Sequence, residues 1–368
     1  MSVKGVRKSV LGVEPYVPGK TVEEVMCERG LSRVVKLGSN ENPYGPFPAA
    51  MKAMEKELTR LNTYPDVSFG KIRKALAALY GLTPENVCIS HGAEGMLQTL
   101  GRTFIDPGDE VVIPEATYQL YAEISKIMGA AIVRIPMKNG VYVDTDALAD
   151  ALRPNTKLVW LNNPNNPTGT VCGKDGIAAL LGKMPSSCWL VVDEAYAEFA
   201  DRDKLPVTAD YIREGYNVIS VRTFSKAYGL AGARIGYSLS NRDVAVVIDT
   251  VSEPFNANRV GIAGALATLK EDVEACETAI GKIKEQRGRI ISALNEMGLE
   301  PVMSETNFVF FSTPFDASRL FEALLDRGVI VRPCRGWGYP RSIRVTVGTD
   351  RDNSIFLDAL SGAMNICG

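Results

Sequence analysis

Histidine is nearly missing from this sequence, which has 368 residues and a single histidine, His91. A metal site built on several histidines is therefore excluded, and no metal centre is expected. A nucleophile activated by histidine is not expected either, because His91 would have to be the base in every such arrangement. We expect the chemistry of this protein to rest on other side chains.

Disulfide and zinc patterns are missing as well. The seven cysteines are spread along the chain, and no two of them form a C-x-x-C pair, so we expect reduced, mostly buried thiols. The chain also lacks a run of about 18 apolar residues that could span a bilayer, and its N-terminus lacks the apolar core of a signal peptide. The resulting prediction is a cytoplasmic protein without membrane contacts.

Clusters of basic residues are absent too, and the formal net charge is -2 with a sequence pI of about 5.8. Binding along a nucleic acid needs clustered lysine and arginine, so no nucleic-acid partner is expected. Neither a G-x-x-x-x-G-K-[ST] loop nor a G-x-G-x-x-G turn between a strand and a helix is present, which argues against a nucleotide-binding enzyme. Small-molecule chemistry is the remaining expectation.

Short apolar runs alternate with helical patterns from about residue 85 to residue 250. The runs EVVIP, TKLVWLNNP and SCWLVVDEA are typical of strands with both faces covered. Helix-like segments such as YQLYAEISKIM lie between them, so the pattern predicts a mostly parallel α/β sheet. Beyond residue 251 a long helical tract over 258–297 precedes short strands and helices that are typical of a smaller α+β unit.

We predict three parts: an N-terminal arm over residues 1–40 that packs with the small domain, a large domain over 41–250, and a small C-terminal domain over 251–368. With 46% hydrophobic residues, the chain can bury one large core and a second, smaller one. No repeat or low-complexity linker separates the parts, so they are expected to pack as one body.

Polar residues stand at the predicted carboxyl ends of these strands, where α/β sheets bind ligands. Asp193 ends the run CWLVVD, and a buried carboxylate there needs a cation or a strong donor. An ordinary helix cap is the plainer interpretation of that aspartate. The turns LNNPNNPTG and SHGAEGM follow other strands. The second opens a helix whose free amides can bind a phosphate, although both are also ordinary turns when taken singly.

Lys226, in the stretch TFSKAYGLAGARIGY, connects these features. A crowded strand end lowers the pKa of an amine from about 10.4 toward neutrality, and a neutral amine attacks carbonyls. A solvated surface lysine is the alternative for this residue alone. Arg234 would hold a phosphate or a carboxylate with its planar guanidinium. A lysine for an aldehyde, a helix N-terminus and an arginine for a phosphate, and Asp193 for a ring nitrogen together predict pyridoxal 5'-phosphate as the cofactor.

The motifs SNENPYGP, NNPNNPTG, VVDEAY and TFSKAYGLAGARIGY, in this order and spacing, resemble the fold-type I pyridoxal-phosphate aminotransferases of class I and II. The segments PYVPGKTVEEV, YPD at 64–66, EPFNANRVG and RSIRVTVGT narrow the resemblance to the histidinol-phosphate aminotransferase family. It covers nearly the whole chain. The implied fold is an α/β fold-type I transferase, with a mostly parallel central sheet covered by helices in a large cofactor-binding domain and a smaller α+β domain.

The resemblance assigns cofactor roles residue by residue, with Lys226, Asp193 and Tyr196 as the catalytic residues. Lys226 would form an imine with the cofactor aldehyde and then move the proton between the substrate α-carbon and the cofactor. Asp193 would keep the ring nitrogen protonated. Asn166 and Tyr196 would bind the phenolate oxygen, while Tyr118 would stack on the ring.

The cofactor phosphate would be held by the amides of Ala93 and Glu94, the hydroxyls of Thr223 and Ser225, and the guanidinium of Arg234. Tyr64 resembles the tyrosine that reaches the cofactor phosphate of the neighbouring subunit, which implies a homodimer with shared active sites. One departure concerns the phosphate turn, where the family usually has aspartate and glutamate and this chain has Glu94 and Gly95.

Arg332 and Arg344 resemble the arginines that bind the substrate phosphate, and the same pair could bind the carboxylates of glutamate. Tyr16 and Asn42 complete the expected substrate set. The implied reaction exchanges an amino group between L-histidinol phosphate and 2-oxoglutarate, giving imidazole acetol phosphate and L-glutamate in histidine biosynthesis.

Other functions stay open at this point. Aromatic amino acid aminotransferases share the architecture, and amino acid phosphate decarboxylases use nearly the same cofactor contacts. A non-catalytic ligand-binding homologue would lack Lys226, Asp193 or Arg234, and none of them is missing. Whether Trp337 or Tyr339 touches the substrate also stays open, since spacing alone does not place them.

Overall fold

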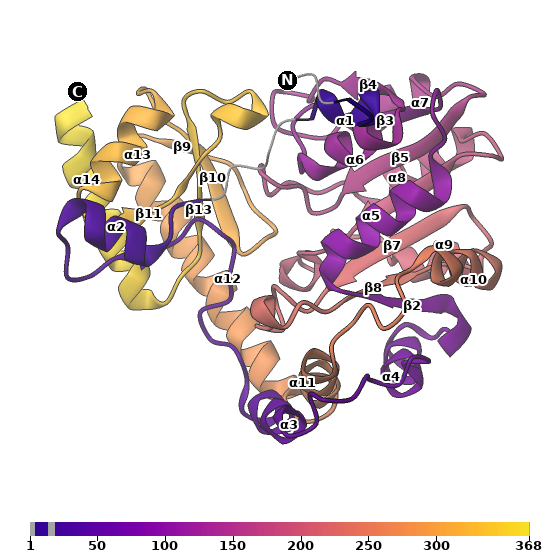
Figure 1. The fold of residues 1–368 in the computed structure, drawn as a ribbon. Coiled ribbons are helices and arrows are strands. Elements are labelled where there is room, and N and C mark those ends of the chain that lie inside the picture. The colour runs from indigo at the N-terminus through magenta and orange to yellow at the C-terminus, as the bar shows by residue number, and fades with distance from the viewer. Residues whose placement is uncertain (1–3, 14–18, 368) are drawn as a thin grey trace.

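The computed structural model describes residues 4–13 and 19–367 (Figure 1). Tyr16, one of the predicted substrate residues, lies outside them. The α-helices are α1 (Lys8–Leu11), α2 (Val22–Arg29), α3 (Pro48–Leu58), α4 (Gly70–Tyr80), α5 (Gly92–Phe104), α6 (Leu120–Met128), α7 (Thr145–Asp150), α8 (Lys174–Lys183), α9 (Thr208–Arg213), α10 (Arg242–Val251), α11 (Arg259–Lys270), α12 (Val273–Glu296), α13 (Ala317–Leu325) and α14 (Asp350–Cys367).

The strands are β1 (Val35–Lys36), β2 (Val87–Ser90), β3 (Glu110–Pro114), β4 (Ala131–Ile135), β5 (Thr156–Asn162), β6 (Trp189–Asp193), β7 (Val218–Thr223), β8 (Gly236–Leu239), β9 (Glu300–Pro301), β10 (Phe308–Ser312), β11 (Val329–Ile330), β12 (Arg332–Pro333) and β13 (Ser342–Thr346). Short 3-10 turns are η1 (Pro84–Asn86), η2 (Ala197–Phe199), η3 (Ala231–Ala233) and η4 (Arg335–Trp337). The strands predicted at EVVIP, TKLVWLNNP and SCWLVVDEA are confirmed as β3, β5 and β6.

Seven strands of the described chain form the central sheet, in the order β2-β8-β7-β6-β5-β3-β4. The strands from β7 to β4 in this order are parallel, whereas β8 runs antiparallel to both of its neighbours. The predicted mostly parallel sheet is therefore confirmed.

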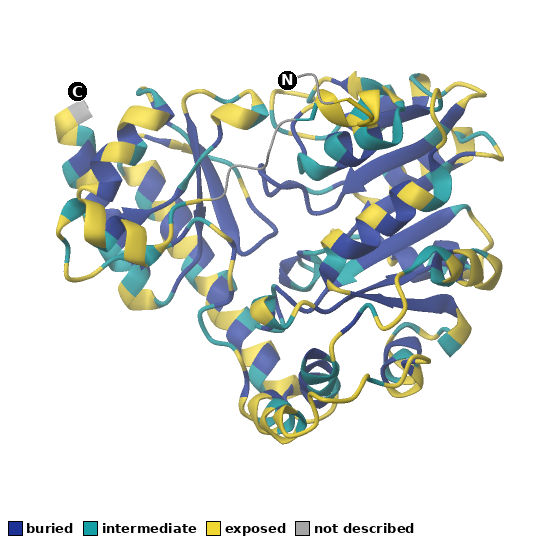
Figure 2. Cartoon of the chain, viewed as in Figure 1, coloured by how far each residue is buried: buried dark blue, intermediate teal, exposed yellow. Residues whose placement is uncertain are grey.

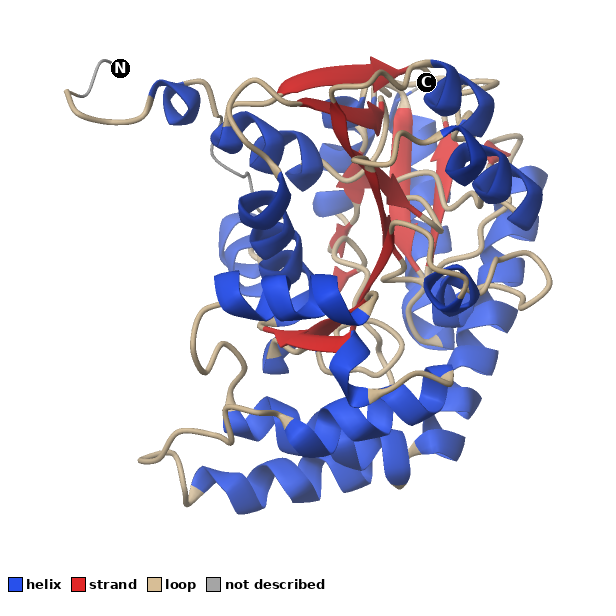
Figure 3. Cartoon of the chain, turned by 90° about the vertical axis from the view of Figure 1, so that its right-hand side faces the viewer, coloured by secondary structure: helices blue, strands red, loops and turns tan. Residues whose placement is uncertain are grey.

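Helices cover both faces of this sheet, as Figure 3 shows, because its central strands are apolar on both faces. Along β5, Val159 and Leu161 belong to one apolar cluster, while Leu158 and Trp160 belong to another. All four side chains are fully buried, and the central strands are dark blue in Figure 2. The continuous apolar runs of the sequence thus form a sheet with two cores.

A smaller unit is built on the antiparallel sheet β12-β13-β10-β9. Apolar side chains of α12, α13 and α14 share one buried cluster with those of β10 and β13. In the N-terminal part of the chain, β1 pairs in parallel with β11, and Val25 of α2 is buried with Leu325 and Ile330. α1 lies elsewhere, against α6, where Arg7 and Ser9 donate hydrogen bonds to the carbonyl oxygen of Ile127. The domain boundaries at residues 40 and 250 stay predictions.

The helical tract predicted over 258–297 is divided in the structure. α11 ends at Lys270 and packs on α3, and α12 begins at Val273. Between them the carboxylate of Asp272 accepts hydrogen bonds from the amides of Ala49 and Ala50, at 3.0 and 2.8 Å. Asp272 thereby caps the N-terminus of α3, which has no side-chain cap of its own. This long-range contact explains the break that helical periodicity does not indicate.

Six cysteines are free thiols, namely Cys27, Cys88, Cys172, Cys188, Cys276 and Cys334. Five of these are buried and Cys27 is exposed, which confirms the expectation of mostly buried thiols. Within residues 4–13 and 19–367, no helix combines the length and the apolar character needed to cross a membrane.

Two backbone segments touch at the base of the loop that carries Lys226. A Cβ atom at Gly45 would lie 2.6 Å from the Cα atom of Gly229, so glycine is required for this contact. At Gly281, inside α12, a Cβ atom would meet nothing within 4 Å. The two glycines therefore form a matched pair for a test of packing.

We expect Gly45→Ala to destabilise the protein by about 2 kcal/mol, because the backbone contact leaves no room for a methyl group. Gly281→Ala should stabilise it by about 0.5–1 kcal/mol, since alanine is the better helix former. Differential scanning fluorimetry of both variants measures the shifts in melting temperature. A Gly45→Ala variant that melts at or above the wild-type temperature would contradict the close contact.

Candidate active site

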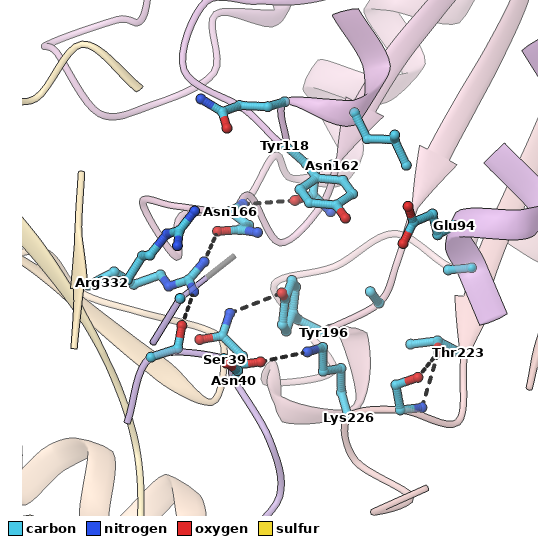
Figure 4. A pocket seen from close by; sticks show the side chains of 18 of the residues that line it. Ser39, Asn40, Glu94, Tyr118, Asn162, Asn166, Tyr196, Thr223, Lys226 and Arg332 are labelled. Atoms are coloured by element: carbon cyan, nitrogen blue, oxygen red, sulfur yellow. Dashed lines mark hydrogen bonds between the residues drawn. The ribbon is translucent and has the colours of Figure 1, made fainter. Parts of the chain in front are cut away.

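A cavity of about 380 Å³ lies between the carboxyl ends of β5, β6 and β7 and the smaller unit. Figure 4 shows Arg332 on one side of it, Glu94 and Thr223 on the opposite side, and Lys226 and Tyr118 between them. Twelve of the predicted site residues in the described chain line the cavity: Ala93, Glu94, Tyr118, Asn166, Asp193, Tyr196, Thr223, Ser225, Lys226, Arg234, Arg332 and Arg344.

Lys226 lies three residues beyond the end of β7 and is half-buried. Its ammonium nitrogen donates a hydrogen bond to the carbonyl oxygen of Ser39 at 3.0 Å. Burial, followed by the positive charge of Arg344, lowers the pKa of Lys226 to about 8. A useful fraction of the amine is therefore neutral near physiological pH, which is the nucleophilic form toward a carbonyl.

Asp193 ends β6 and is buried beside Asn162, its partner in the register of β5. Burial raises the pKa of Asp193 to about 6, although the Tyr121 hydroxyl and the Ala195 amide lower it by donating hydrogen bonds at 2.7 and 3.1 Å. Both donors are neutral, so a cationic group in the cavity would offset the cost of burying this carboxylate. A protonated ring nitrogen is such a group.

The N-terminus of α5 supplies free backbone amides at one end of the cavity. The residue before this helix, His91, makes no side-chain cap, so the first amides remain available to a ligand. Gly92 has a φ of +84°, and a Cβ atom there would lie 2.6 Å from a terminal nitrogen of Arg234. Glycine therefore lets the guanidinium approach the turn.

Two hydroxyls complete this end of the cavity. The hydroxyl of Thr223 donates to that of Ser225 at 2.9 Å, and a guanidinium nitrogen of Arg234 lies 3.4 Å from the same Ser225 oxygen. A helix N-terminus, two hydroxyls and an arginine converge here, which is the donor set of a phosphate site. The cavity thus fits the expected cofactor, with a phosphate site, an amine and a buried carboxylate along its length.

The departure in the phosphate turn has a packing explanation. A Cβ atom at Gly95 would lie 2.6 to 2.8 Å from three ring atoms of His91, so the imidazole occupies the space above this glycine. A side chain at position 95 would displace the ring. Glu94 remains in the first turn of α5 with its amide at the open end of the helix.

Hydrogen bonds from several segments orient the other side of the cavity. Arg344 donates to the side-chain oxygen of Asn166 at 2.5 Å and to the carbonyl oxygen of Gly38 at 2.8 Å. The side-chain amide of Asn40 donates to the hydroxyl oxygen of Tyr196 at 3.0 Å, which leaves the phenolic proton to point elsewhere. Asn166 and Tyr196 are both predicted to bind the phenolate oxygen of the cofactor, and the hydrogen bonds from Arg344 and Asn40 hold their side chains in place.

Sequence reasoning missed Asn40 and Asn162, which also line the cavity. Asn162 accepts from the amide of Asn166 at 2.8 Å and donates to the carbonyl oxygen of Asp193 at 2.9 Å. It could have been found, because it is the last residue of β5 and strand ends bind ligands. The sequence indicates Asn40 less clearly, because the motif SNENPYGP, which contains it, does not reveal the contact with Tyr196.

Two predicted residues in the described chain do not line the cavity. Asn42 donates to the carbonyl oxygen of Ala227 at 2.8 Å and accepts from the amide of Tyr44, so it supports the loop behind Lys226. Tyr64 is 75% exposed, and its ring stacks on Phe255 with centroids 4.5 Å apart. The substrate role of Asn42 and the cofactor role of Tyr64 stay predictions.

The aminotransferase class I and II family matches residues 32–360. Histidinol-phosphate aminotransferases of Moorella thermoacetica and Symbiobacterium thermophilum are each 40% identical, covering 96% and 98% of this chain and 92% and 99% of those proteins. The crystal structure of histidinol-phosphate aminotransferase from Sinorhizobium meliloti, in complex with pyridoxal-5'-phosphate, has a TM-score of 0.91 and 30% identity, covering 100% of this chain and 99% of that one.

Tyr121 provides a test of the buried carboxylate. Its ring is fully buried, stacks on Trp160, and presents its hydroxyl to Asp193. Tyr121→Phe removes the donor that lowers the pKa of Asp193, so this pKa should rise above about 6. A protonated Asp193 no longer attracts a cationic ring. As the pH is lowered, the variant should therefore lose its affinity for the cofactor at a higher pH than the wild type does.

Fluorescence titrations of the apoenzyme with pyridoxal phosphate, made at several values between pH 5 and pH 8, measure the cofactor affinity as a function of pH. The midpoint of its loss is the quantity compared. Tyr211→Phe is the control, because it also removes a buried phenol, whose hydroxyl contacts the Lys174 carbonyl oxygen instead. Coincident midpoints for the wild type and Tyr121→Phe would show that the hydroxyl does not set the ionisation of Asp193.

Proposed function

The chain belongs to the class I and II aminotransferases and, within them, to the histidinol-phosphate aminotransferases, and from this membership we propose its reaction. It transfers the amino group of L-histidinol phosphate to 2-oxoglutarate, giving imidazole acetol phosphate and L-glutamate in histidine biosynthesis. The supporting observation is the pair Arg332 and Arg344, which are neighbours on β12 and β13 and line the same cavity as Lys226. Two positive charges suit a doubly charged phosphate.

Pyridoxal 5'-phosphate is the cofactor of this enzyme family. When bound, it supplies an electron-withdrawing ring that stabilises the charge left after a proton leaves the substrate α-carbon. We propose that Thr223, Ser225 and Arg234 bind its phosphate, together with the amides of Ala93 and Glu94. The convergence of these groups at the N-terminus of α5 supports this assignment.

Tyr118 would stack on the cofactor ring. Asp193 would hold the proton on the ring nitrogen, since its raised pKa marks a carboxylate that gains from a cationic partner. Asn166 and Tyr196 would donate hydrogen bonds to the phenolate oxygen. The contacts from Arg344 and Asn40 orient these two donors before any ligand arrives.

Lys226 is the proposed proton carrier. With a pKa of about 8, its side-chain nitrogen accepts a proton from the substrate α-carbon in the neutral form and returns it from the charged form. In the second half-reaction, Arg332 and Arg344 would bind the carboxylates of glutamate or 2-oxoglutarate. One pair of arginines would then serve two anions of different shape.

The substrate is tested by steady-state kinetics of the purified enzyme with pyridoxal phosphate. We expect kcat/KM for L-histidinol phosphate to exceed that for phenylalanine and tyrosine by at least about 100-fold, because only the phosphate ester offers Arg332 and Arg344 a doubly charged group to bind. A preference for phenylalanine would move the assignment to an aromatic aminotransferase. Release of carbon dioxide from an amino acid phosphate would indicate the decarboxylase instead.

We also propose a homodimer with shared active sites. Large apolar side chains are exposed on and after α3, namely Met51, Leu58, Leu61, Tyr64 and Val67. Phe255, which stacks on Tyr64, is exposed as well. Such a group of exposed apolar side chains favours burial against a partner. In the dimer, Tyr64 would reach the cofactor phosphate of the other subunit.

Subunit mixing tests this arrangement. Lys226→Ala and Tyr64→Ala should each lower activity strongly, and refolding the two together should restore about a quarter of the wild-type activity, because half of the random dimers carry one intact site of two. Lys226→Ala refolded with wild type is the control for recovery on refolding, because half of its sites are intact whether or not the subunits exchange. If the mixture is no more active than the sum of its parts, each site is built within one chain.

A cytoplasmic location is part of the proposal. The free state of six of the seven cysteines, Cys27 to Cys334, supports it, since disulfides are rare in reducing compartments.

A further inference from the structure

The loop that contains η4 touches the large unit through side chains of Trp337 and Tyr339. The indole nitrogen of Trp337 donates to the carbonyl oxygen of Thr117 at 2.8 Å, and the hydroxyl of Tyr339 donates to that of Gly140 at 2.6 Å. Trp337 lines the cavity, whereas Tyr339 is absent from its lining and packs edge-on against Phe310. The two aromatic residues therefore differ in their relation to the site.

The indole ring of Trp337 lies near both arginines of the cavity. The guanidinium carbons of Arg332 and Arg344 are 5.8 and 5.7 Å from its ring centroid. An aromatic face attracts a guanidinium at such distances, and the attraction is stronger where water is excluded. Because the two arginines carry like charges on neighbouring strands, an aromatic ring close to both offsets part of their repulsion.

The other edge of Trp337 is tied to the cofactor side of the cavity. Thr117, whose carbonyl oxygen accepts the indole N–H, precedes Tyr118 in the chain. The hydroxyl of Thr117 donates to the side-chain oxygen of Asn165 at 2.9 Å, and Asn165 in turn donates to the carbonyl oxygen of Ala116. The acceptor of the indole is thus fixed by its own hydrogen bonds, and Trp337 joins the arginine pair to the Tyr118 segment.

We propose that Trp337 is a positioning residue that makes the site selective for a substrate with a phosphate end. It holds Arg332 and Arg344 as a pair at a set distance from the segment that carries Tyr118, so that one doubly charged group is bound by both. This inference rests on the proposed function. Of the two aromatic residues whose role the sequence left open, it gives the role at the substrate site to Trp337 and not to Tyr339.

Two substrates that differ only in the phosphate measure the effect. We expect Trp337→Met to reduce the ratio of kcat/KM for L-histidinol phosphate to that for L-histidinol about tenfold, mainly through KM for the phosphate ester, because the aromatic face is lost. Trp337→Phe should keep the ratio within about threefold, since a ring remains beside the arginines. Tyr339→Phe, which removes the other contact of the same loop, should leave the ratio unchanged.

Inorganic phosphate provides a readout that does not depend on turnover. Calorimetric titration of the holoenzyme, whose cofactor-phosphate site is filled, should show about tenfold weaker phosphate binding in Trp337→Met than in the wild type. Phosphate should also change the tryptophan fluorescence of the wild type and not that of Trp337→Phe, a comparison that does not depend on folding of the methionine variant.

The outcomes separate the two proposals. Equal losses of kcat/KM for L-histidinol phosphate and L-histidinol in Trp337→Met, or unchanged phosphate affinity, would overturn the role of Trp337. A wild-type enzyme that does not use L-histidinol phosphate would refute the proposed function, while the phosphate titrations would still decide whether Trp337 positions the arginines.

Discussion

Burial of an acid and an amine in one cavity is the constraint on which the site depends. The same exclusion of water raises the pKa of Asp193 to about 6 and lowers that of Lys226 to about 8, so burial makes the charged form of each group less favourable. A ligand with a cationic ring nitrogen and a carbonyl relieves both costs at once. The parallel sheet makes this possible, since β6 and β7 are neighbours and their carboxyl ends face the same side.

The parts of the site that could be predicted from the sequence are those that follow directly from a strand end. Asp193 ends β6 and Lys226 follows β7, so an apolar run and a single charged residue were enough to indicate them. Asn40 shows why other parts could not be predicted. It contacts Tyr196 and accepts from Asn307, which are 156 and 267 residues away, and its φ of +55° depends on that assembly. Local spacing contains no information about such contacts.

The lone histidine illustrates a second limit. Counting residues was sufficient to exclude a multi-histidine metal site, but it left the position of His91 open. In the structure the ring lies over Gly95 in the first turn of α5, the turn whose amides we propose to bind the cofactor phosphate. The glycine that departs from the family pattern and the histidine are therefore one packing solution. A sequence motif gives the two residues separately and does not show that the ring of His91 leaves no room for a side chain at position 95.

Arg344 links the substrate end of the cavity to its catalytic centre. It orients Asn166 through a hydrogen bond, and its positive charge is the largest charge effect that lowers the pKa of Lys226. A substrate anion bound to Arg344 would screen that charge, so the pKa of Lys226 should rise when the anion is present. The amine then becomes a stronger base only after the substrate is in place. In the proposed reaction, the guanidinium that binds the substrate would thus also adjust the pKa of the base that acts on it. A lysine at position 344 would do this poorly, because it lacks the planar fork that reaches both Asn166 and Gly38.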